Sequence, residues 1–376
     1  MSAVVVGAGP VGAVCALALA QAGVAVRVLE AQPGDADGDT RTLALAHGSQ
    51  LILDRLGVWR RLGEVTPITR IHISQRGAPG MTRLAADALG VPALGYVLPY
   101  AELNAALKQA LREAAVTVDY GCAVERIASD AAAATLHTAL GAIDTPLAIV
   151  ADGGRGRDAP APRIKRDYAQ TAVVCDVDTE LPHAQQAYER FTPDGPAALL
   201  PKGDRYALVW TADSDTAARI AALDDDAFLE ALYRHFGGRQ GRFLAAGPRR
   251  TFPLTLAYSG STSAARVVRI GNAAQTLHPV AGQGFNIGLR DAWELATLCA
   301  DTPPDALGGE AMRAAYARGR RADVLGGLGF TDFLVRAFAG DFPPQRLARG
   351  LGLLALEALP PLKTFVARRM MFGARG

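Results

Sequence analysis

The spacing Gly7-x-Gly9-x-x-Gly12, directly after the β-branched run Ala3–Val6, constrains the fold of this chain more than any other feature. In a strand–turn–helix unit, the first glycine of this pattern permits a tight turn. The second lets a phosphate approach the backbone, and the third lets the helix pack on the strand. The pattern therefore predicts a buried strand, a turn and a helix from about Val11 to Gln21.

A second buried strand, Val24–Leu29, ends in Glu30, which lies 23 residues after Gly7. An acid at a spacing of roughly 20 residues takes the ribose hydroxyls of a bound dinucleotide. A glycine pattern alone is weak evidence, since a tight turn with coincidental glycines would produce it as well. Because the flanking strands and the acid accompany it, we expect a parallel βαβ unit that binds an adenine dinucleotide.

The composition is that of a folded globular protein, with 376 residues of which 50% are hydrophobic and 20% charged. This length suits two domains, or one large α/β unit with an inserted second layer. The formal net charge of +2 is too small to favour a nucleic-acid partner. Scattered cysteines and histidines favour a reduced, intracellular chain without a metal site. Glycines and a proline interrupt the apolar stretch Met1–Val26, so we expect no targeting segment and a cytoplasmic location.

A second glycine-rich stretch, Arg269–Asp291, follows the apolar strand Arg266–Ile270 and leads into a helical pattern. Such backbone presents unpaired N–H groups and the positive end of a helix dipole. Asn272 and Asn286 are short and polar enough to reach sugar hydroxyls or the edge of a heterocycle. An ordinary strand–loop–helix connection is the alternative, but the density of small residues favours a cofactor cradle.

The remaining periodicity predicts the following helices and strands. Helices are expected at Ser49–Arg61, Glu102–Ala115, Asp225–Phe236, Arg290–Asp301 and Glu310–Leu325. Strands are expected at Ile68–Ser74, Thr117–Tyr120, Val124–Ile127, Thr145–Val150, Ala169–Val177, Ala187–Thr192, Ala197–Pro201, Tyr206–Thr211 and Thr251–Leu256. The region from Ala169 to Leu256 contains one helix among its strands, so we interpret it as an inserted sheet that walls a substrate pocket.

Two positions in the first half of the chain leave alternatives open. Arg41 follows a polar loop and could meet a phosphate or remain a solvated charge. Asp152 and Gly153 follow a buried strand and could form a plain turn or a second contact to the cofactor.

Three elements carry a resemblance to a known family. They are Gly7-x-Gly9-x-x-Gly12 with Glu30, then Asp152-Gly153, then Gly271-Asn272 with His278-Pro279-x-x-Gly282-Gln283-Gly284-Phe285-Asn286. Together they resemble the single-component FAD-dependent aromatic hydroxylases of the para-hydroxybenzoate hydroxylase type. Within that group, Ile270–Asp291 is similar to the signature of the ubiquinone-biosynthesis hydroxylases, and most similar to the 2-polyprenyl-6-methoxyphenol hydroxylase branch. The segment Glu189-Arg-Phe-Thr-x-x-Gly195-Pro is similar to that branch as well.

The resemblance implies an α/β fold: a Rossmann-like FAD-binding domain, an inserted mostly-β substrate domain and a helical carboxyl terminus. The corresponding boundaries are 1–70, 100–168 and 262–325 for the FAD-binding domain, 71–99 and 169–261 for the substrate domain, and 326–376 for the helical segment. It also implies FAD as cofactor, NAD(P)H as a transient reductant and O₂ as co-substrate, with one oxygen atom passed to a polyprenylphenol.

The residues that the resemblance implies for cofactor binding are Gly7, Gly9, Pro10, Gly12, Glu30, Arg41, Val124, Asp152, Gly271, Asn272, Pro279, Gly282, Gly284, Phe285 and Asn286. Pro279 and Gly282 would shape the face at which oxygen reacts, and no side chain is assigned as catalytic. The helix that opens at Gly284–Asn286 would stabilise negative charge on the reduced flavin. We interpret His278 as structural.

Two further interpretations stay open for the function. The same flavin machinery could act on a smaller, non-prenylated aromatic, or the chain could be a weakly active flavin-binding scaffold of a biosynthetic assembly, since Gly154–Arg157 departs from the family pattern. The apolar stretch Gly350–Leu362, with basic residues at both ends, is too short to span a bilayer. It could contact the inner face of a membrane or partner proteins of ubiquinone biosynthesis, or it could pack on the core as a terminal helix.

Overall fold

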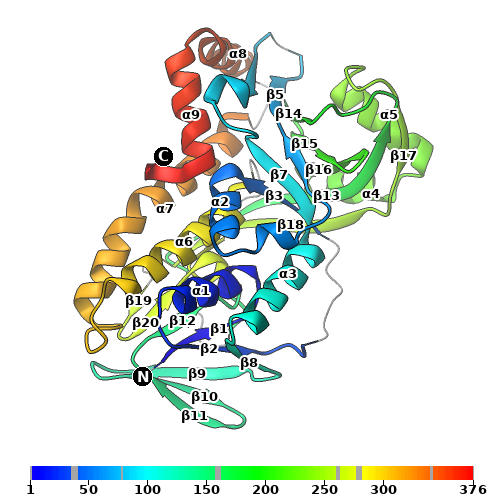
Figure 1. The fold of residues 1–376 in the computed structure, drawn as a ribbon. Coiled ribbons are helices and arrows are strands. Elements are labelled where there is room, and N and C mark those ends of the chain that lie inside the picture. Colours follow the sequence, from blue (N-terminus) through cyan, green and yellow to red (C-terminus); the bar gives the residue numbers. More distant parts are fainter. Residues whose placement is uncertain are drawn as a thin grey trace.

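The computed structural model describes residues 2–34, 41–77, 79–156, 162–259, 263–276, 282–338 and 342–375. Figure 1 shows a parallel sheet with its helices in the lower half of the view and a large second sheet at the upper right. The last helices run along the left side of the molecule to its upper end.

The lower sheet has six strands and contains the amino-terminal strand at its centre. In spatial order the strands are β19 (Ser263–Ala264), β20 (Val267–Arg269), β12 (Ala148–Val150), β1 (Ala3–Val6), β2 (Val26–Glu30) and β8 (Thr117–Tyr120). β1 pairs in parallel with β12 and with β2, so that Val4 lies opposite Ala148 and Arg27. All four residues of β1 are buried, as expected for a central parallel strand that is covered on both faces. The predicted βαβ unit is therefore present.

Successive residues of β1 point to opposite faces of this sheet, and each face has its own cover. Ala3 and Val5 join the core under α1 (Pro10–Gln21), α3 (Tyr100–Glu113) and α6 (Gln283–Ala300). Val4 and Val6 pack on the other face against a small antiparallel sheet. That sheet consists of β9 (Val124–Ser129), β10 (Ala134–Thr138) and β11 (Gly141–Thr145). The apolar run in β1 therefore contributes to the cores on both faces of the parallel sheet.

The upper sheet has nine strands, and eight of them form one continuous path. In spatial order these are β21 (Gln275–Thr276), β18 (Arg250–Tyr258), β13 (Ile164–Thr179), β16 (Arg205–Asp213), β15 (Gly195–Lys202), β14 (Gln186–Thr192), β5 (Arg70–Gln75) and β6 (Met81–Ala85), with β17 (Phe243–Ala246) beside β13. The pairs are antiparallel except for β14 with β5. One face packs on two helices, through a core that includes Leu208, Trp210 and Phe228.

These two helices are α4 (Ser214–Ala222) and α5 (Asp225–Phe236). The prediction of a single helix in this region was wrong, because α4 is short and follows directly from β16. Each helix begins with an aspartate whose side chain accepts a backbone N–H: Asp213 accepts from Thr216 at 2.9 Å and Asp224 from Ala227 at 2.8 Å. Both starts are therefore encoded locally.

A third, small sheet lies between the two large ones, with the order β3 (Thr42–Ala46), β7 (Gly95–Pro99) and β4 (Thr66–Ile68). The predicted strand Ile68–Ser74 is divided between β4 and β5, because the chain passes from one sheet to another at Thr69. The predicted helix Ser49–Arg61 is likewise divided. α2 (His47–Arg55) ends before Gly57, whose φ of +68° breaks the helix, and the short 3₁₀ helix Trp59–Arg61 follows.

The carboxyl-terminal part is helical, as predicted, but its boundaries differ from the prediction. α7 (Glu310–Phe338) continues 13 residues past Leu325, and the stretch Gly350–Leu362 is divided between α8 (Pro343–Ala358) and α9 (Pro360–Phe372). Two prolines after Leu359 end α8, and α9 turns away by 97°. Within the residues described, a helix of the length and apolarity needed to cross a membrane does not occur singly; the bent pair α8–α9 meets that test only when its two members are combined.

The predicted fold class is confirmed: a Rossmann-like parallel sheet, an inserted mostly-β part and a helical carboxyl terminus. The positions assigned to the domain boundaries stay predictions. β7, which falls in the predicted substrate domain, pairs with β3 and β4 rather than with the nine-stranded sheet.

Candidate active site

The turn between β1 and α1 leaves the amino-terminal end of α1 open. The N-cap is Gly9, which has no side chain and so makes no side-chain cap hydrogen bond. A Cβ on Gly9 would meet no atom within 4 Å, whereas one on Gly12 would lie 2.0 Å from the carbonyl oxygen of Gly7. Gly7 has a φ of +101°, which favours glycine. Gly7 and Gly12 are thus required by packing, while Gly9 faces free space in front of a helix dipole, as a pyrophosphate requires.

Glu30 lies at the end of β2 beside this turn. Its Oε2 accepts a hydrogen bond from the N–H of Ala8 at 2.6 Å, and its Oε1 accepts one from Gln32 at 2.8 Å. The carboxylate is therefore held next to the Gly7–Gly9 turn by backbone groups. Its predicted contact with the adenosine ribose stays a prediction, and this position fits it.

A pocket at the carboxyl ends of β1 and β12 brings together two other predicted residues, Val124 and Asp152. Val6, Val150, Gly154 and Ala273 line it as well. Asp152 accepts a hydrogen bond from the N–H of Gly154 at 2.9 Å, so it shapes its own turn. Asn272 is exposed beside this turn: a Cβ on Gly154 would lie 2.9 Å from the Asn272 carbonyl oxygen.

The glycine-rich stretch connects both large sheets before it enters α6. β20 belongs to the parallel sheet and β21 to the nine-stranded sheet, and Gly271 turns between them with a φ of +58°. A Cβ on Gly271 would lie 3.2 Å from the Val11 side chain in the first turn of α1, and one on Gly288 would lie 2.9 Å from it. The two glycine-rich turns therefore pack against each other, which supports one continuous cradle.

The N-cap of α6 is also a glycine, Gly282, which has a φ of +61° and makes no side-chain cap hydrogen bond. Gly284 and Phe285 in its first turn are partly exposed. Like α1, this helix presents backbone N–H groups and a positive dipole end, which suits an electron-rich heterocycle.

The side chain of Asn286 has a different task from the sugar or ring contact predicted for it. Its Oδ1 accepts hydrogen bonds from the N–H of Ala46 and the hydroxyl of Ser49, both at 2.7 Å. Its Nδ2 donates to the carbonyl oxygens of Ala44 at 3.1 Å and Gly282 at 2.7 Å. The side chain thus ties the first turn of α6 to β3 and α2, and the predicted cofactor contact of Asn286 stays a prediction.

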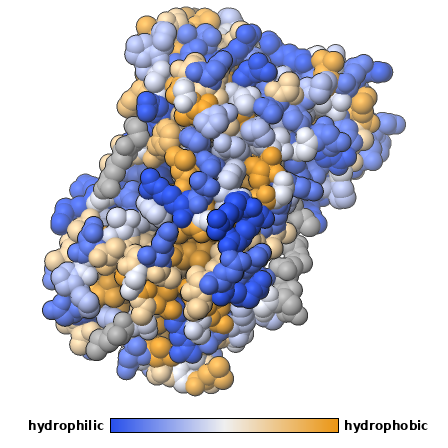
Figure 2. Space-filling model, viewed as in Figure 1, coloured by the Kyte–Doolittle hydropathy of each residue, from blue (hydrophilic) through white to orange (hydrophobic). Residues whose placement is uncertain are grey.

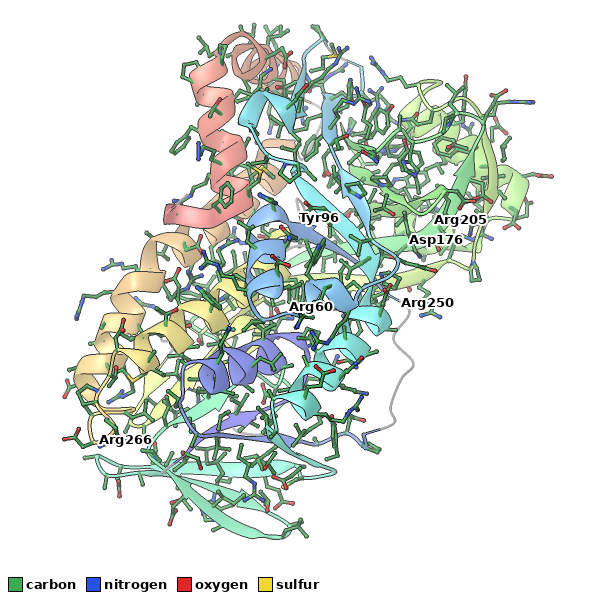
Figure 3. The ribbon with its side chains drawn as sticks, in the orientation of Figure 1. Arg60, Tyr96, Asp176, Arg205, Arg250 and Arg266 are labelled. Carbon is green, nitrogen blue, oxygen red and sulfur yellow. The ribbon has the colours of Figure 1, made fainter. Side chains whose placement is uncertain are left out.

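The other predicted residues are placed as follows. Arg41 lies before β3 with its guanidinium 4.9 Å from the centre of the Tyr100 ring. Pro10 is the first residue of α1 and is buried. His278 and Pro279 fall in 277–281, outside the described residues. Figure 3 shows Tyr96 of β7 between the parallel sheet and the nine-stranded sheet.

A buried ion network behind the cradle was missed by the sequence analysis. Arg320 of α7 is 2% exposed, and it donates to Asp291 and Glu294 of α6 and to Asp323, each at 2.7 Å. Asp291 in turn accepts the N–H of Gly271 at 3.0 Å and the amide of Gln275 at 2.7 Å. Through Asp291, the network therefore fixes the backbone of the cradle at Gly271. The available signal was Asp291 at a core-facing position of the predicted helix, where a charge needs a partner.

These residues together fit FAD. Two helices whose N-caps are glycines begin beside the Gly7–Gly12 and Gly271–Gly284 backbone. The space in front of Gly9 admits a phosphate, and Glu30 follows the glycines at the spacing of an acid that binds ribose.

Comparison with known proteins agrees with this geometry. A family model described as an FAD binding domain matches residues 1–321. The chain is 37% identical to ubiquinone hydroxylase UbiL of Rhodospirillum rubrum, over 98% of this chain and 88% of that protein. It is 33% identical to 3-demethoxyubiquinol 3-hydroxylase of Escherichia coli, over 96% of this chain and 95% of that protein.

Solved structures share the fold. A variant of HpxO from Klebsiella pneumoniae, complexed with FAD, superposes with a TM-score of 0.77 at 20% identity and full coverage of both chains (100% each). PqsL of Pseudomonas aeruginosa, in complex with 2-aminobenzoylacetate, gives a TM-score of 0.77 at 20% identity over 94% of this chain and 99% of that one. At this level of identity the likeness concerns the fold alone.

Proposed function

This chain belongs to the FAD-dependent hydroxylases of ubiquinone biosynthesis, and on that premise we propose that it hydroxylates the aromatic ring of a polyprenylated phenol with NAD(P)H and O₂. The observation that carries the proposal is the continuous backbone cradle, in which the open ends of α1 and α6 are joined through the Gly271 turn. FAD, when bound, supplies the activation of O₂. The chain binds it, orients it and excludes water from the reacting face.

Reduction of the flavin is proposed to depend on a transient visit of NAD(P)H. The chain has one dinucleotide fingerprint, which FAD occupies, so a nicotinamide is held only briefly. We therefore expect slow NAD(P)H oxidation by the FAD-loaded protein alone and faster oxidation, by tenfold or more, when a prenylphenol is present. Absorbance of the reduced nicotinamide at a fixed enzyme concentration measures both rates.

The outcome also separates the other interpretations. A response to small phenols without a prenyl chain, and none to prenylphenols, would favour the smaller aromatic substrate. Equal rates with and without every phenol tested would favour a scaffold function.

We further propose that the enzyme meets its substrate at a membrane surface, through an apolar ridge on α8 and α9. A polyprenyl tail partitions into lipid, and the ridge consists of partly exposed side chains at one end of the molecule, opposite the β10–β11 hairpin (Figure 1). Its members, 43–66% exposed, are Leu347, Leu351, Leu354, Leu359, Leu362 and Phe365. Figure 2 shows apolar atoms among polar ones at this end of the molecule. Leu347, Leu351 and Leu354 follow helical spacing, so they share one face of α8.

The basic residues at the two ends of the apolar stretch are Arg346, Arg349, Lys363, Arg368 and Arg369, and three of them bond to other groups of the protein. Arg346 donates to the carbonyl oxygen of Gly77, Lys363 pairs with Glu357 at 2.8 Å, and Arg369 donates to the carbonyl oxygen of Ala322 at 2.9 Å. Arg349 has a buried Nε. Arg368 is exposed. The membrane contact we propose therefore relies on the leucines and on Arg368, each basic residue adding about 1 kcal/mol near an anionic surface.

Replacing Leu347 and Leu351 by glutamine is expected to weaken binding to anionic vesicles. Each leucine is 56% exposed, so the change leaves folding nearly intact. Loss of two leucines from the lipid interface costs about 2 kcal/mol, roughly a thirtyfold drop in partitioning. Vesicle sedimentation with phosphatidylglycerol-containing liposomes measures it.

The matched control is Leu140→Gln, since Leu140 is 87% exposed and lies in the β10–β11 hairpin. Vesicle binding that falls equally in both variants, or in neither, would remove the ridge as the membrane contact.

A further inference from the structure

Glu189 lies on β14 and points to the face of the nine-stranded sheet that α4 and α5 do not cover. Its neighbours Tyr188 and Arg190 point the other way: Tyr188 joins the core with α5, and Arg190 donates to the carbonyl oxygen of His235 at 3.1 Å. Side chains alternate along a strand. Glu189 therefore shares its face with Ala187 and Phe191.

This face is apolar and partly accessible around the carboxylate. In register, Glu189 lies opposite Ile73 of β5 on one side and Ala198 of β15 on the other. Three apolar residues of this face are partly exposed: Ile73, Ala198 and Leu200. The opposite face is buried under the helices; its Leu199 side chain is 0% exposed. An accessible apolar face with one polar group at its centre is the kind of surface that binds and orients an apolar ligand.

The two residues that flank Glu189 on this face connect it to the apolar ridge and, through β7 and β3, to the start of α6. Phe191, 3% exposed, packs with Leu353 on α8, the helix that carries the apolar ridge. Ala187, also 3% exposed, packs with Val97 of β7. β7 pairs with β3, whose Ala44 and Ala46 hold Asn286 at the start of α6. Glu189 thus stands between the ridge and the amino-terminal end of α6.

Among the described residues, the side-chain carboxylate of Glu189 makes no hydrogen bond or ion pair, and several charged groups on the elements around it have other partners. Asp176, on the same face, pairs with Lys202 at 2.7 Å. Arg250 is aligned with Glu189 across the sheet but lies four strands away, about 19 Å at the usual strand spacing. Figure 3 labels both Asp176 and Arg250. Asp178, two residues after Asp176 on the same face, pairs with Arg205 at 2.9 Å. On α7 and α8 the charged residues include Asp332, Arg346, Arg349 and Glu357. Asp332 pairs with Arg166, and Glu357 pairs with Lys363. Burial raises the pKa of Glu189 to about 8.

We propose that Glu189 is the catalytic base that receives the phenolic proton of the substrate, an inference that rests on the proposed function. The phenol O–H bond breaks, the proton goes to a carboxylate oxygen of Glu189, and the electron pair stays on the phenolate oxygen. That charge spreads to the ortho and para carbons and makes the ring a stronger nucleophile toward the oxygen that the flavin chemistry supplies. A base that titrates near the working pH suits this transfer.

The test compares Glu189→Gln with Glu230→Gln in the FAD-loaded protein; Glu230 is an exposed glutamate on α5, the helix that packs on the other face of the same sheet. The probes are 2-(dimethylallyl)phenol and its methyl ether, whose binding is measured by flavin fluorescence. We expect Glu189→Gln to bind the methyl ether like the parent and to lower kcat/KM for the phenol by roughly 10²-fold. The parent kcat/KM should rise with pH through about 8, and this limb should be absent from the variant. Glu230→Gln should match the parent.

A second measurement reports on Glu189 without catalysis. Because its pKa is higher in the folded protein than in the unfolded one, its neutral form contributes stability that is complete below pH 4.5 and is lost as the pH rises through about 8. The melting temperature of Glu189→Gln relative to the parent should therefore rise between pH 5 and pH 9. Equal pH dependence of melting in the two proteins, or equal kcat/KM profiles, would overturn the assignment of Glu189. If the parent enzyme did not hydroxylate the phenol, that result would instead contradict the proposed function.

Discussion

Arg320→Met is expected to lower the free energy of unfolding by about 3–5 kcal/mol, because it leaves buried carboxylates without their cation. Arg320 is 2% exposed and donates to Asp291, Asp323 and Glu294. Since Asp291 also accepts the N–H of Gly271, the cradle should loosen and the FAD content of the purified protein should fall. Urea denaturation of the FAD-free protein measures the first effect, and flavin absorbance per chain measures the second.

Arg321→Met is the matched control, because Arg321 is the next residue of α7 and is exposed. It should change stability by less than about 0.5 kcal/mol. If Arg320→Met behaved like this control, the network would not hold the cradle as described.

Gly9→Ala is expected to weaken FAD binding alone, whereas Gly12→Ala is expected to destabilise the fold as well. A Cβ on Gly9 meets no atom within 4 Å, and its φ of −61° suits alanine, so the FAD-free protein should melt like the parent. The added methyl occupies the space where the pyrophosphate approaches α1, and FAD affinity should fall by roughly 10- to 100-fold. Gly12→Ala places a Cβ 2.0 Å from the carbonyl oxygen of Gly7, so it should destabilise the FAD-free fold as well.

Gly329→Ala controls for a glycine replaced in open space, because its Cβ also meets nothing within 4 Å, in the middle of α7. Its FAD affinity should equal that of the parent. FAD titrations followed by fluorescence, together with melting of the FAD-free proteins, distinguish the four chains. Normal FAD affinity in Gly9→Ala would place the pyrophosphate elsewhere.

Features encoded within a few residues could be predicted from the sequence. β1 and α5 have the predicted boundaries, because an apolar run marks the first and an aspartate cap the second; the predicted boundaries of β8 hold as well. The strand Ile68–Ser74 was predicted as one element because its pattern is continuous, yet its two halves pair with different sheets. The bend at Pro360 was overlooked because apolar character continues on both sides of it.

Some residues of the candidate site could likewise be predicted from local sequence, and others could not. The glycine spacing and Glu30 follow from the local pattern of one βαβ unit. The task of Asn286 does not, because its partner Ala46 lies 240 residues away in the sequence. Glu189 belongs to a segment that the resemblance had already singled out, but its apolar surroundings arise from the parallel pairing of β14 with β5, more than 100 residues earlier in the chain.

The claim that the protein hydroxylates a prenylphenol is tested most directly by the origin of the oxygen in the product. FAD-loaded enzyme, NAD(P)H and 2-(dimethylallyl)phenol would be incubated under dioxygen labelled with the heavy oxygen isotope, and the product analysed by mass spectrometry. The account predicts one labelled oxygen atom in each molecule of hydroxylated product, with NAD(P)H consumed in proportion. Consumption of NAD(P)H and O₂ without a labelled phenolic product would contradict it.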